Sequence, residues 1–141
     1  MTPYQVAAIA AVLALSGVGL YLHDRRNTAR ARRRLALRPQ LGPEEFTRAH
    51  FGGGERRTKL AGEIHELIQA HLPYSVKGLA PGDSFVEDLR MDALDSMATV
   101  ELVMDVEKKY GITIPNEDAA RILTVQELVE YLERRLEAGQ P

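Results

Sequence analysis

The chain has 141 residues, 45% of them hydrophobic, which is sufficient for one compact domain of ordinary size with an extension. It contains no cysteine, so it has no disulfide framework and no thiolate metal site, and any thiol chemistry would need a cofactor. The formal net charge of −2 conceals a division, because residues 1–43 hold seven arginines against one aspartate, about +6, which leaves about −8 for the remainder. We therefore expect the two parts to meet different partners.

Residues 1–23 have the pattern of a transmembrane anchor. Pro3 to Leu22 contain no charged side chain, and Val6 to Leu22 are almost wholly Ala, Val, Leu, Ile and Gly, with Tyr4 and Tyr21 near the two ends. About twenty helical residues at roughly 1.5 Å each cover the hydrocarbon core, and tyrosines suit both interfaces. Two alternatives are a buried helix, which needs a larger core than this chain offers, and a cleaved signal peptide, which normally begins with positive charge.

Seven arginines follow the apolar run, between Arg25 and Arg38. Arginine beside a span is retained on the cytoplasmic side, so we expect a single-pass membrane protein whose remaining chain is cytoplasmic. Val6–Leu22 would contact lipid tails, and Arg25–Arg38 would attract anionic headgroups. Nucleic-acid binding is the competing interpretation, but no aromatic residues interleave with the arginines and the acidic remainder would repel phosphate. We therefore expect no nucleic-acid partner.

Residues 24–58 are predicted to form an arginine-rich juxtamembrane segment and a linker. The stretch from Pro39 to Gly54 contains two prolines and four glycines, interrupted by one short helical turn that begins after Gly42 and that Gly52 ends. Phe46 and Phe51 either dock on the following domain or belong to a disordered tether.

Residues 59–138 have the apolar periodicity of a helical domain. A first helix is expected from about Gly54 until Pro73 stops it, with one apolar stripe formed by Leu60, Ile64, Leu67, Ile68 and Leu72. A loop over residues 74–84 follows, after which Phe85, Val86 and Leu89 are expected in the core. His65 and His71 lack acidic or sulfur partners at ligand spacing, so we expect no metal site.

Three further helices complete this pattern. The longest begins at Ser96 and ends at Gly111 in a left-handed cap, and its expected apolar face consists of Met97, Val100, Val103, Met104, Val106 and Tyr110. A short helix is expected over Asn116 to Ile122. Thr124 and Glu127 form a capping box for the last helix, whose core face is Val125, Leu128, Val129, Leu132 and Leu136. The prediction is an all-α small bundle.

The stretch from Asp95 onward resembles an acyl carrier protein. The residues that carry the resemblance are the pair Asp95-Ser96, the run V-E-L-V-M, then Y-G-I-T-I-P-N-E-D-A-A-R-I and T-V-Q-E-L-V-E-Y-L at the spacing of that family. The similarity extends from about Leu60 to Leu136. It implies a four-helix bundle of acyl-carrier type, here behind an N-terminal membrane anchor.

The resemblance also implies a function. Ser96 would carry 4′-phosphopantetheine, moved from coenzyme A by a phosphopantetheinyl transferase that Asp95 helps to recognise. The cofactor thiol would hold acyl groups as thioesters for enzymes of lipid or related acyl metabolism. No histidine and no nucleophile-elbow motif lies near Ser96 in the sequence, so we expect a carrier without catalytic residues of its own.

Acidic residues around this serine form the expected docking surface. Negative charge there would raise encounter rates with the basic surfaces of acyl-loading and acyl-accepting enzymes. The alternative is a merely solvated helix face. The residues expected to contact partners are Met97, Glu101, Asp105, Glu107, Glu117 and Asp118, with Asp92 and Asp95 adding charge.

The spacing before the serine departs from the family pattern. Counting forward from S-F-V-E-D-L places Ala93 at the position of the family's serine, whereas counting back from V-E-L-V-M places Ser96 there without a gap. We prefer Ser96, because an insertion is easier in a loop than within a helix. If neither count gives an acceptor, the domain would be a carrier-like docking module at the membrane that lacks the prosthetic group.

Overall fold

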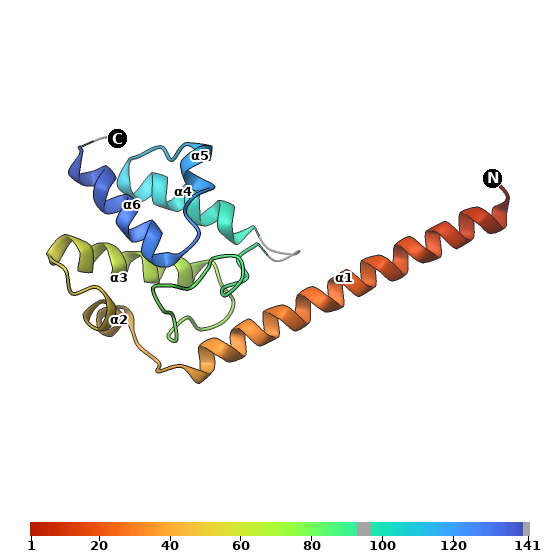
Figure 1. Ribbon diagram of the computed structural model, residues 1–141, viewed down its shortest axis with the longest axis horizontal. Coiled ribbons are helices and arrows are strands. Elements are labelled where there is room, and N and C mark those ends of the chain that lie inside the picture. The colour runs from red at the N-terminus through yellow and green to blue at the C-terminus, as the bar shows by residue number, and fades with distance from the viewer. Residues whose placement is uncertain (93–96, 140–141) are drawn as a thin grey trace.

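The computed structural model describes residues 1–92 and 97–139 (Figure 1). Within these ranges the chain forms six helices and no named strand. The helices are α1 (Pro3–Leu37), α2 (Pro43–His50), α3 (Glu55–Ala70), α4 (Ala98–Tyr110), α5 (Asn116–Ala119) and α6 (Val125–Glu137). The expected all-α class is confirmed.

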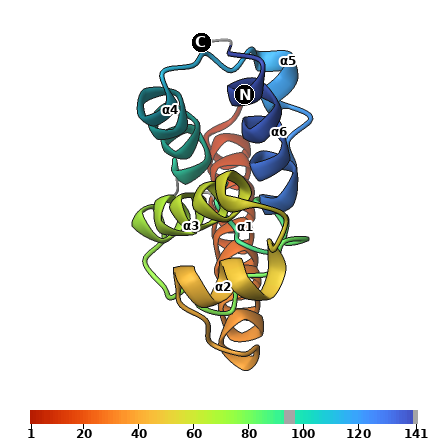
Figure 2. The same cartoon turned by 90° about the vertical axis from the view of Figure 1, so that its left-hand side faces the viewer.

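Helices α3 to α6 form a small bundle, in which α3 packs against both α4 and α6 (Figure 2). The stripes expected on α3 and α6 are buried, with Ile64, Ile68 and Leu132 fully enclosed, whereas Leu67 and Leu136 are only partly buried. The predicted local signals are present. Thr124 and Glu127 form the capping box of α6, and Gly111 ends α4 with φ 64° in the left-handed region.

Helix α1 is one continuous helix that carries both the apolar run and most of the arginines. Its 35 residues correspond to about 52 Å at about 1.5 Å per residue. It is long and apolar enough to cross a membrane, and the apolar window is not buried by the rest of the chain. Figure 1 shows the N-terminal, apolar half of α1 projecting freely from the domain.

The second half of α1 is docked on the domain. Ala31 and Leu35 are buried, and the chain just after the helix is held by Arg38, whose Nη1 lies 2.6 Å from a buried carboxylate oxygen of Asp83. Arg34 lies 3.6 Å from Asp88 on the same loop. We expected the two oppositely charged parts of the chain to meet different partners, but part of the basic charge pairs with the acidic domain itself.

Helix α2 covers one end of α3. Phe46 is fully buried and Phe51 nearly so, and the Phe46 ring lies 5.1 Å from the ring of buried His65. Of the two alternatives for these phenylalanines, docking on the domain is correct. The helix ends at His50, before the glycine expected to stop it.

Several sequence expectations about the bundle are wrong in detail. On α4 the buried residues are Ala98, Leu102 and Val106, so three members of the expected core face are exposed: Met97, Val100 and Met104. Val86 is 39% exposed, and Met91 is fully buried beside Phe85 and Leu89. The expected helix over residues 116–122 is a single turn that ends at Ala119.

Candidate functional site

The long loop between α3 and α4 leads to the predicted attachment site and is fixed by packing up to residue 91. Leu89 and Met91 are fully buried, and the Tyr74 hydroxyl donates a hydrogen bond to the Leu89 carbonyl. The Thr99 backbone N–H donates to the Met91 carbonyl at 3.2 Å, which joins this loop to the first turn of α4. Ser96 and Asp95, the predicted acceptor and recognition residue, and Ala93, the alternative position, lie outside the described residues.

The described residues on both sides of this segment are open to solvent. Asp92 is exposed, and Met97 is 65% exposed at the N-cap position of α4, where its side chain makes no capping hydrogen bond. The positive end of the α4 dipole lies beside these described residues and favours a phosphodiester nearby. These surroundings fit a covalently attached phosphopantetheine, which would supply the thiol that the cysteine-free chain lacks.

Two of the predicted docking residues contact a histidine from another helix end. Nε2 of His71, at the C-terminal end of α3, lies 2.7 Å from Asp105, and Nδ1 lies 3.1 Å from Glu101. Glu101 remains 57% exposed at its side chain and Asp105 46%. His71 therefore belongs to this surface, although it is 30 residues from Glu101 and 34 from Asp105 in the chain, and no local motif reveals it.

Two other predicted docking residues have structural roles. A carboxylate oxygen of Glu107 accepts a hydrogen bond from the Ile114 backbone N–H at 2.8 Å, which fixes the turn after α4. Asp118 accepts one from the Tyr131 hydroxyl at 2.9 Å, which ties α5 to α6. Glu117 is exposed and makes none of these contacts. Of the predicted docking carboxylates on α4 and α5, Glu101 and Glu117 are therefore exposed and Asp105 is half-exposed.

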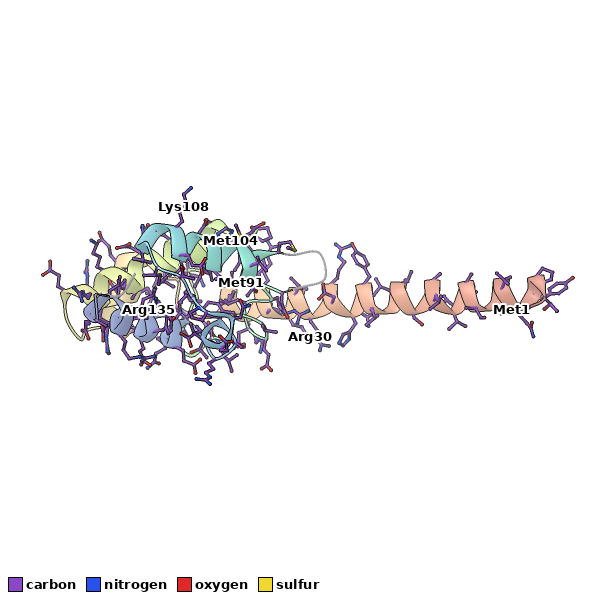
Figure 3. All side chains as sticks on the ribbon, turned by 90° about the horizontal axis from the view of Figure 1, so that it is seen from above. Met1, Arg30, Met91, Met104, Lys108 and Arg135 are labelled. Atoms are coloured by element: carbon purple, nitrogen blue, oxygen red, sulfur yellow. The ribbon has the colours of Figure 1, made fainter. Side chains whose placement is uncertain are left out.

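The exposed side of α4 also carries apolar side chains. Met97, Val100 and Met104 are between 53% and 65% exposed and share a helix with the two carboxylates that His71 contacts. Figure 3 shows Met104 and Lys108 on the outer side of this helix. A surface that mixes exposed methionine and valine with carboxylates is suited to contact with another protein.

Behind this surface lies a small apolar cavity. It has a volume of about 90 Å³ and lies between α4, α5 and α6, where its walls include Phe85, Val103, Ile114 and Leu128. Among the described residues, no group of three or more His, Cys, Asp or Glu side chains is placed to hold a metal ion.

The chain matches the family described as phosphopantetheine attachment site over residues 62–132, which is just over half of its 141 residues. The match covers most of α3, the long loop, α4, α5 and most of α6. Domains of this kind are the sites of 4′-phosphopantetheine attachment and are generally carriers of acyl or peptidyl groups without catalysis of their own. They work with a phosphopantetheinyl transferase and with acyl-handling enzymes. The chain therefore belongs to the phosphopantetheine attachment family, and its helical domain is of the acyl carrier type.

Proposed function

We propose that this protein is a membrane-tethered acyl carrier, which holds acyl groups as thioesters on a phosphopantetheine attached to Ser96 and delivers them to enzymes of lipid or related acyl metabolism. The observation that carries the proposal is the continuity of α1, since the exposed apolar helix and the segment docked on the carrier domain are one helix.

This continuity favours an uncleaved anchor over a signal peptide. Ala31 and Leu35 of α1 are buried against the domain, so the half of the helix that follows the apolar run belongs to the fold, and cleavage after the run would divide a continuous helix. An exposed helix that is apolar on every side is stable in lipid and unfavourable in water. The arginines after the apolar run favour an orientation with the carrier domain in the cytoplasm.

The choice of Ser96 rests on the sequence count and on the start of α4. The helix begins at Ala98 with Met97 at the N-cap, so Ser96 precedes the N-cap by one position, whereas Ala93 precedes it by four. An acceptor close to a helix start can enter another enzyme's active site without disturbing the bundle. The apolar cavity behind α4 suits an acyl cargo better than a charged one.

The acceptor is tested by intact mass after incubation with coenzyme A and a broad-specificity phosphopantetheinyl transferase. Wild type should gain one phosphopantetheine, and Ser96→Ala should gain none. If wild type stays unmodified while Ala93→Ser becomes labelled, the upstream count is correct and the natural protein is a docking module without the prosthetic group.

The anchor is tested by fractionation. The full chain should sediment with membranes, resist extraction by high salt or alkali and enter detergent, because salt screens arginine–lipid contacts but does not reverse burial of an apolar helix. Protease added to intact cells should spare the carrier domain. Release by salt alone would leave only a peripheral contact and would contradict the tether.

A further inference from the structure

The docked half of α1 begins where the apolar run ends. Asp24 is the second residue after Leu22, and it is 7% exposed in an ion pair with Arg90 of the loop before α4. Arg90 has φ 54°, an uncommon conformation for a side chain of this size, which the contact with Asp24 helps to hold. The loop that leads to the attachment segment is therefore fastened to α1 at the end of its apolar part.

The position of this contact along α1 sets its depth relative to a bilayer. Asp24 lies two helical steps beyond Leu22, a rise of about 3 Å. The headgroup layer extends roughly 5 to 8 Å beyond the hydrocarbon core on each side. If the apolar run spans the core, the Asp24–Arg90 pair lies at the level of the headgroups.

A second contact fixes the direction of the helix. Arg38 binds Asp83 fourteen residues further along the chain from Asp24, about 20 Å at the helical rise. Between the two contacts, the Leu35 carbonyl packs so closely on Gly78 that a Cβ there would lie 1.9 Å from the oxygen. Attachment at both ends leaves the domain one orientation relative to the axis of α1.

This orientation turns one end of the bundle toward the membrane. In Figure 1 the N-terminal end of α4 and helix α5 lie on the side from which the free half of α1 projects, while α2 lies on the opposite side. The exposed residues at the membrane side thus include Met97, Val100, Glu101 and Glu117.

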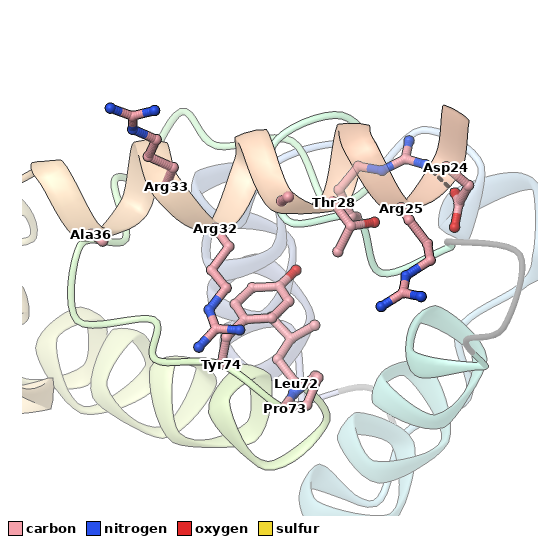
Figure 4. A pocket seen from close by; sticks show the side chains of 11 residues that line it. Asp24, Arg25, Thr28, Arg32, Arg33, Ala36, Leu72, Pro73 and Tyr74 are labelled. Carbon is pink, nitrogen blue, oxygen red and sulfur yellow. Dashed lines mark hydrogen bonds and ion pairs between the residues drawn. The ribbon is translucent and has the colours of Figure 1, made fainter. Parts of the chain in front are cut away.

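Basic residues beside the junction would hold this end close to lipid. Arg25 and Arg32 point from α1 into a cavity of about 510 Å³ whose opposite wall is formed by Leu72, Pro73 and Tyr74 (Figure 4). Arg25, about 5 Å along α1 from Leu22, lies at the level of the headgroups and offsets part of the repulsion between the acidic domain and an anionic bilayer, whereas Arg32, about 15 Å from Leu22, lies beyond them. The carboxylates on α4 and α5 are not attracted to an anionic bilayer, and their charge is complementary to a basic protein surface instead.

We infer that α1, docked on the carrier domain, holds the α4–α5 end of that domain at the membrane surface. There this end of the domain meets the basic face of an integral membrane enzyme at the level of the headgroups. This inference rests on the proposed tether. It narrows the partner class, because a large soluble complex would have to fit between this end of the domain and the bilayer, whereas a membrane enzyme already occupies that level. The mixed apolar and acidic surface is complementary to such a protein face and not to lipid.

The orientation is tested with single cysteines, which the cysteine-free chain makes specific. Asp92→Cys, Glu45→Cys and Leu15→Cys are each labelled with a fluorophore in the full chain, reconstituted in lipid nanodiscs. Headgroup nitroxide lipids should quench the probe at residue 92 several-fold more than the probe at residue 45 on α2. Brominated acyl chains should quench the probe at residue 15.

The three probes distinguish failure of the proposed orientation from failure of the proposed tether. Equal quenching at residues 92 and 45, with residue 15 quenched, would overturn the orientation and leave the tether intact. No quenching at residue 15 would overturn the tether itself. Asp24→Arg should reduce quenching at residue 92 by placing two cations together, and the reversed pair Asp24→Arg with Arg90→Asp should restore it, since aspartate tolerates the positive φ.

The partner class is tested by a photo-crosslinking amino acid at Val100, with the same group at Glu45 as control, in native membranes. Adducts specific to residue 100 should be enzymes with membrane-spanning segments, identified by mass spectrometry, and Asp24→Arg should diminish them. Adducts only with proteins that lack such segments would overturn the inference even if the quenching pattern is as expected.

Discussion

Replacing Gly78 by alanine tests whether α1 is docked on the carrier domain. A Cβ at this position would lie 1.9 Å from the carbonyl oxygen and 2.8 Å from the carbonyl carbon of Leu35. Ordinary contacts begin at 3.4 Å, so the loop and the last turns of α1 would have to separate by about 1.5 Å. Because a gap of about 1 Å already removes up to half of a dispersion contact, the docked helix cannot absorb this shift.

The cost follows from what the docking buries. Leu35 is 2% exposed, and complete burial of a leucine side chain stabilises by about 1.5 to 3 kcal/mol. Weakening of the hydrogen bonds from Arg38 to Asp83, of 2.6 and 2.8 Å, adds a further part, so we expect undocking to become easier by roughly 2 to 4 kcal/mol.

Limited trypsin digestion of the protein in nanodiscs measures this change, because cleavage at the arginines of α1 requires local opening of the helix. When opening is fast relative to cleavage, a loss of this size accelerates cleavage by about 30-fold or more. Gly82→Ala is the matched control, since nothing lies within 4 Å of its Cβ position. Equal cleavage rates for the two variants would refute the docked arrangement.

Two further predictions concern the bundle. Leu128→Ala should lower the free energy of unfolding by about 2 to 5 kcal/mol in urea titrations, because Leu128 is 5% exposed. Leu123→Ala, at a position 58% exposed, should change it little. A loss below about 0.5 kcal/mol for Leu128→Ala would place that face of α6 in solvent. Burial lowers the pKa of His65 from its ordinary 6.5, although the backbone of Val76 and Glu66 act in the opposite direction. The unfolded state therefore binds more protons, so this contribution to stability is present above about pH 6.5 and is lost as the pH falls below it. The melting temperatures at pH 7 and pH 5 should differ less for His65→Leu than for wild type. His50→Gln is the control at an exposed histidine.

The helices that the sequence predicts best are those with strong local signals. The last helix has a capping box at Thr124 and Glu127 and one uninterrupted apolar stripe, so its start and its buried face follow from residues a few positions apart. Gly111 at the end of α4 is of the same kind. Such signals act within one or two turns and do not depend on how the helices are arranged.

The buried face of α4 could not be chosen from periodicity alone. Met97, Val100 and Met104 form one apolar stripe at helical spacing, and Ala98, Leu102 and Val106 form another. A helix that serves both a core and a partner surface has two such stripes, and hydrophobicity does not say which one packs inward. The structure buries the stripe of Ala98, Leu102 and Val106.

The contacts that define the site are mostly long-range. The pairs Asp24–Arg90 and Arg38–Asp83 join residues 66 and 45 positions apart, and His71 reaches Asp105 across 34. Charge counts assigned the arginines to lipid and the acidic residues to partners, but a count holds no information about which opposite charges meet within the fold. The acceptor itself lies in residues 93–96, outside the described structure, and Ser96 stays a prediction.

The carboxylates around the site should separate into docking and structural residues. Glu101→Gln removes a charge that is 57% exposed, so the rate of phosphopantetheinyl transfer should fall, most at low salt, with little change in stability. Glu107→Ala leaves the Ile114 N–H without its acceptor and should lower the free energy of unfolding by about 1 to 3 kcal/mol. At a temperature where both variants remain folded, transfer to Glu107→Ala should match wild type more closely than transfer to Glu101→Gln. A transfer rate that falls equally for both, with the same loss of its salt dependence, would show that the whole acidic surface acts as one undivided field and that the contact of Glu107 with Ile114 does not set it apart.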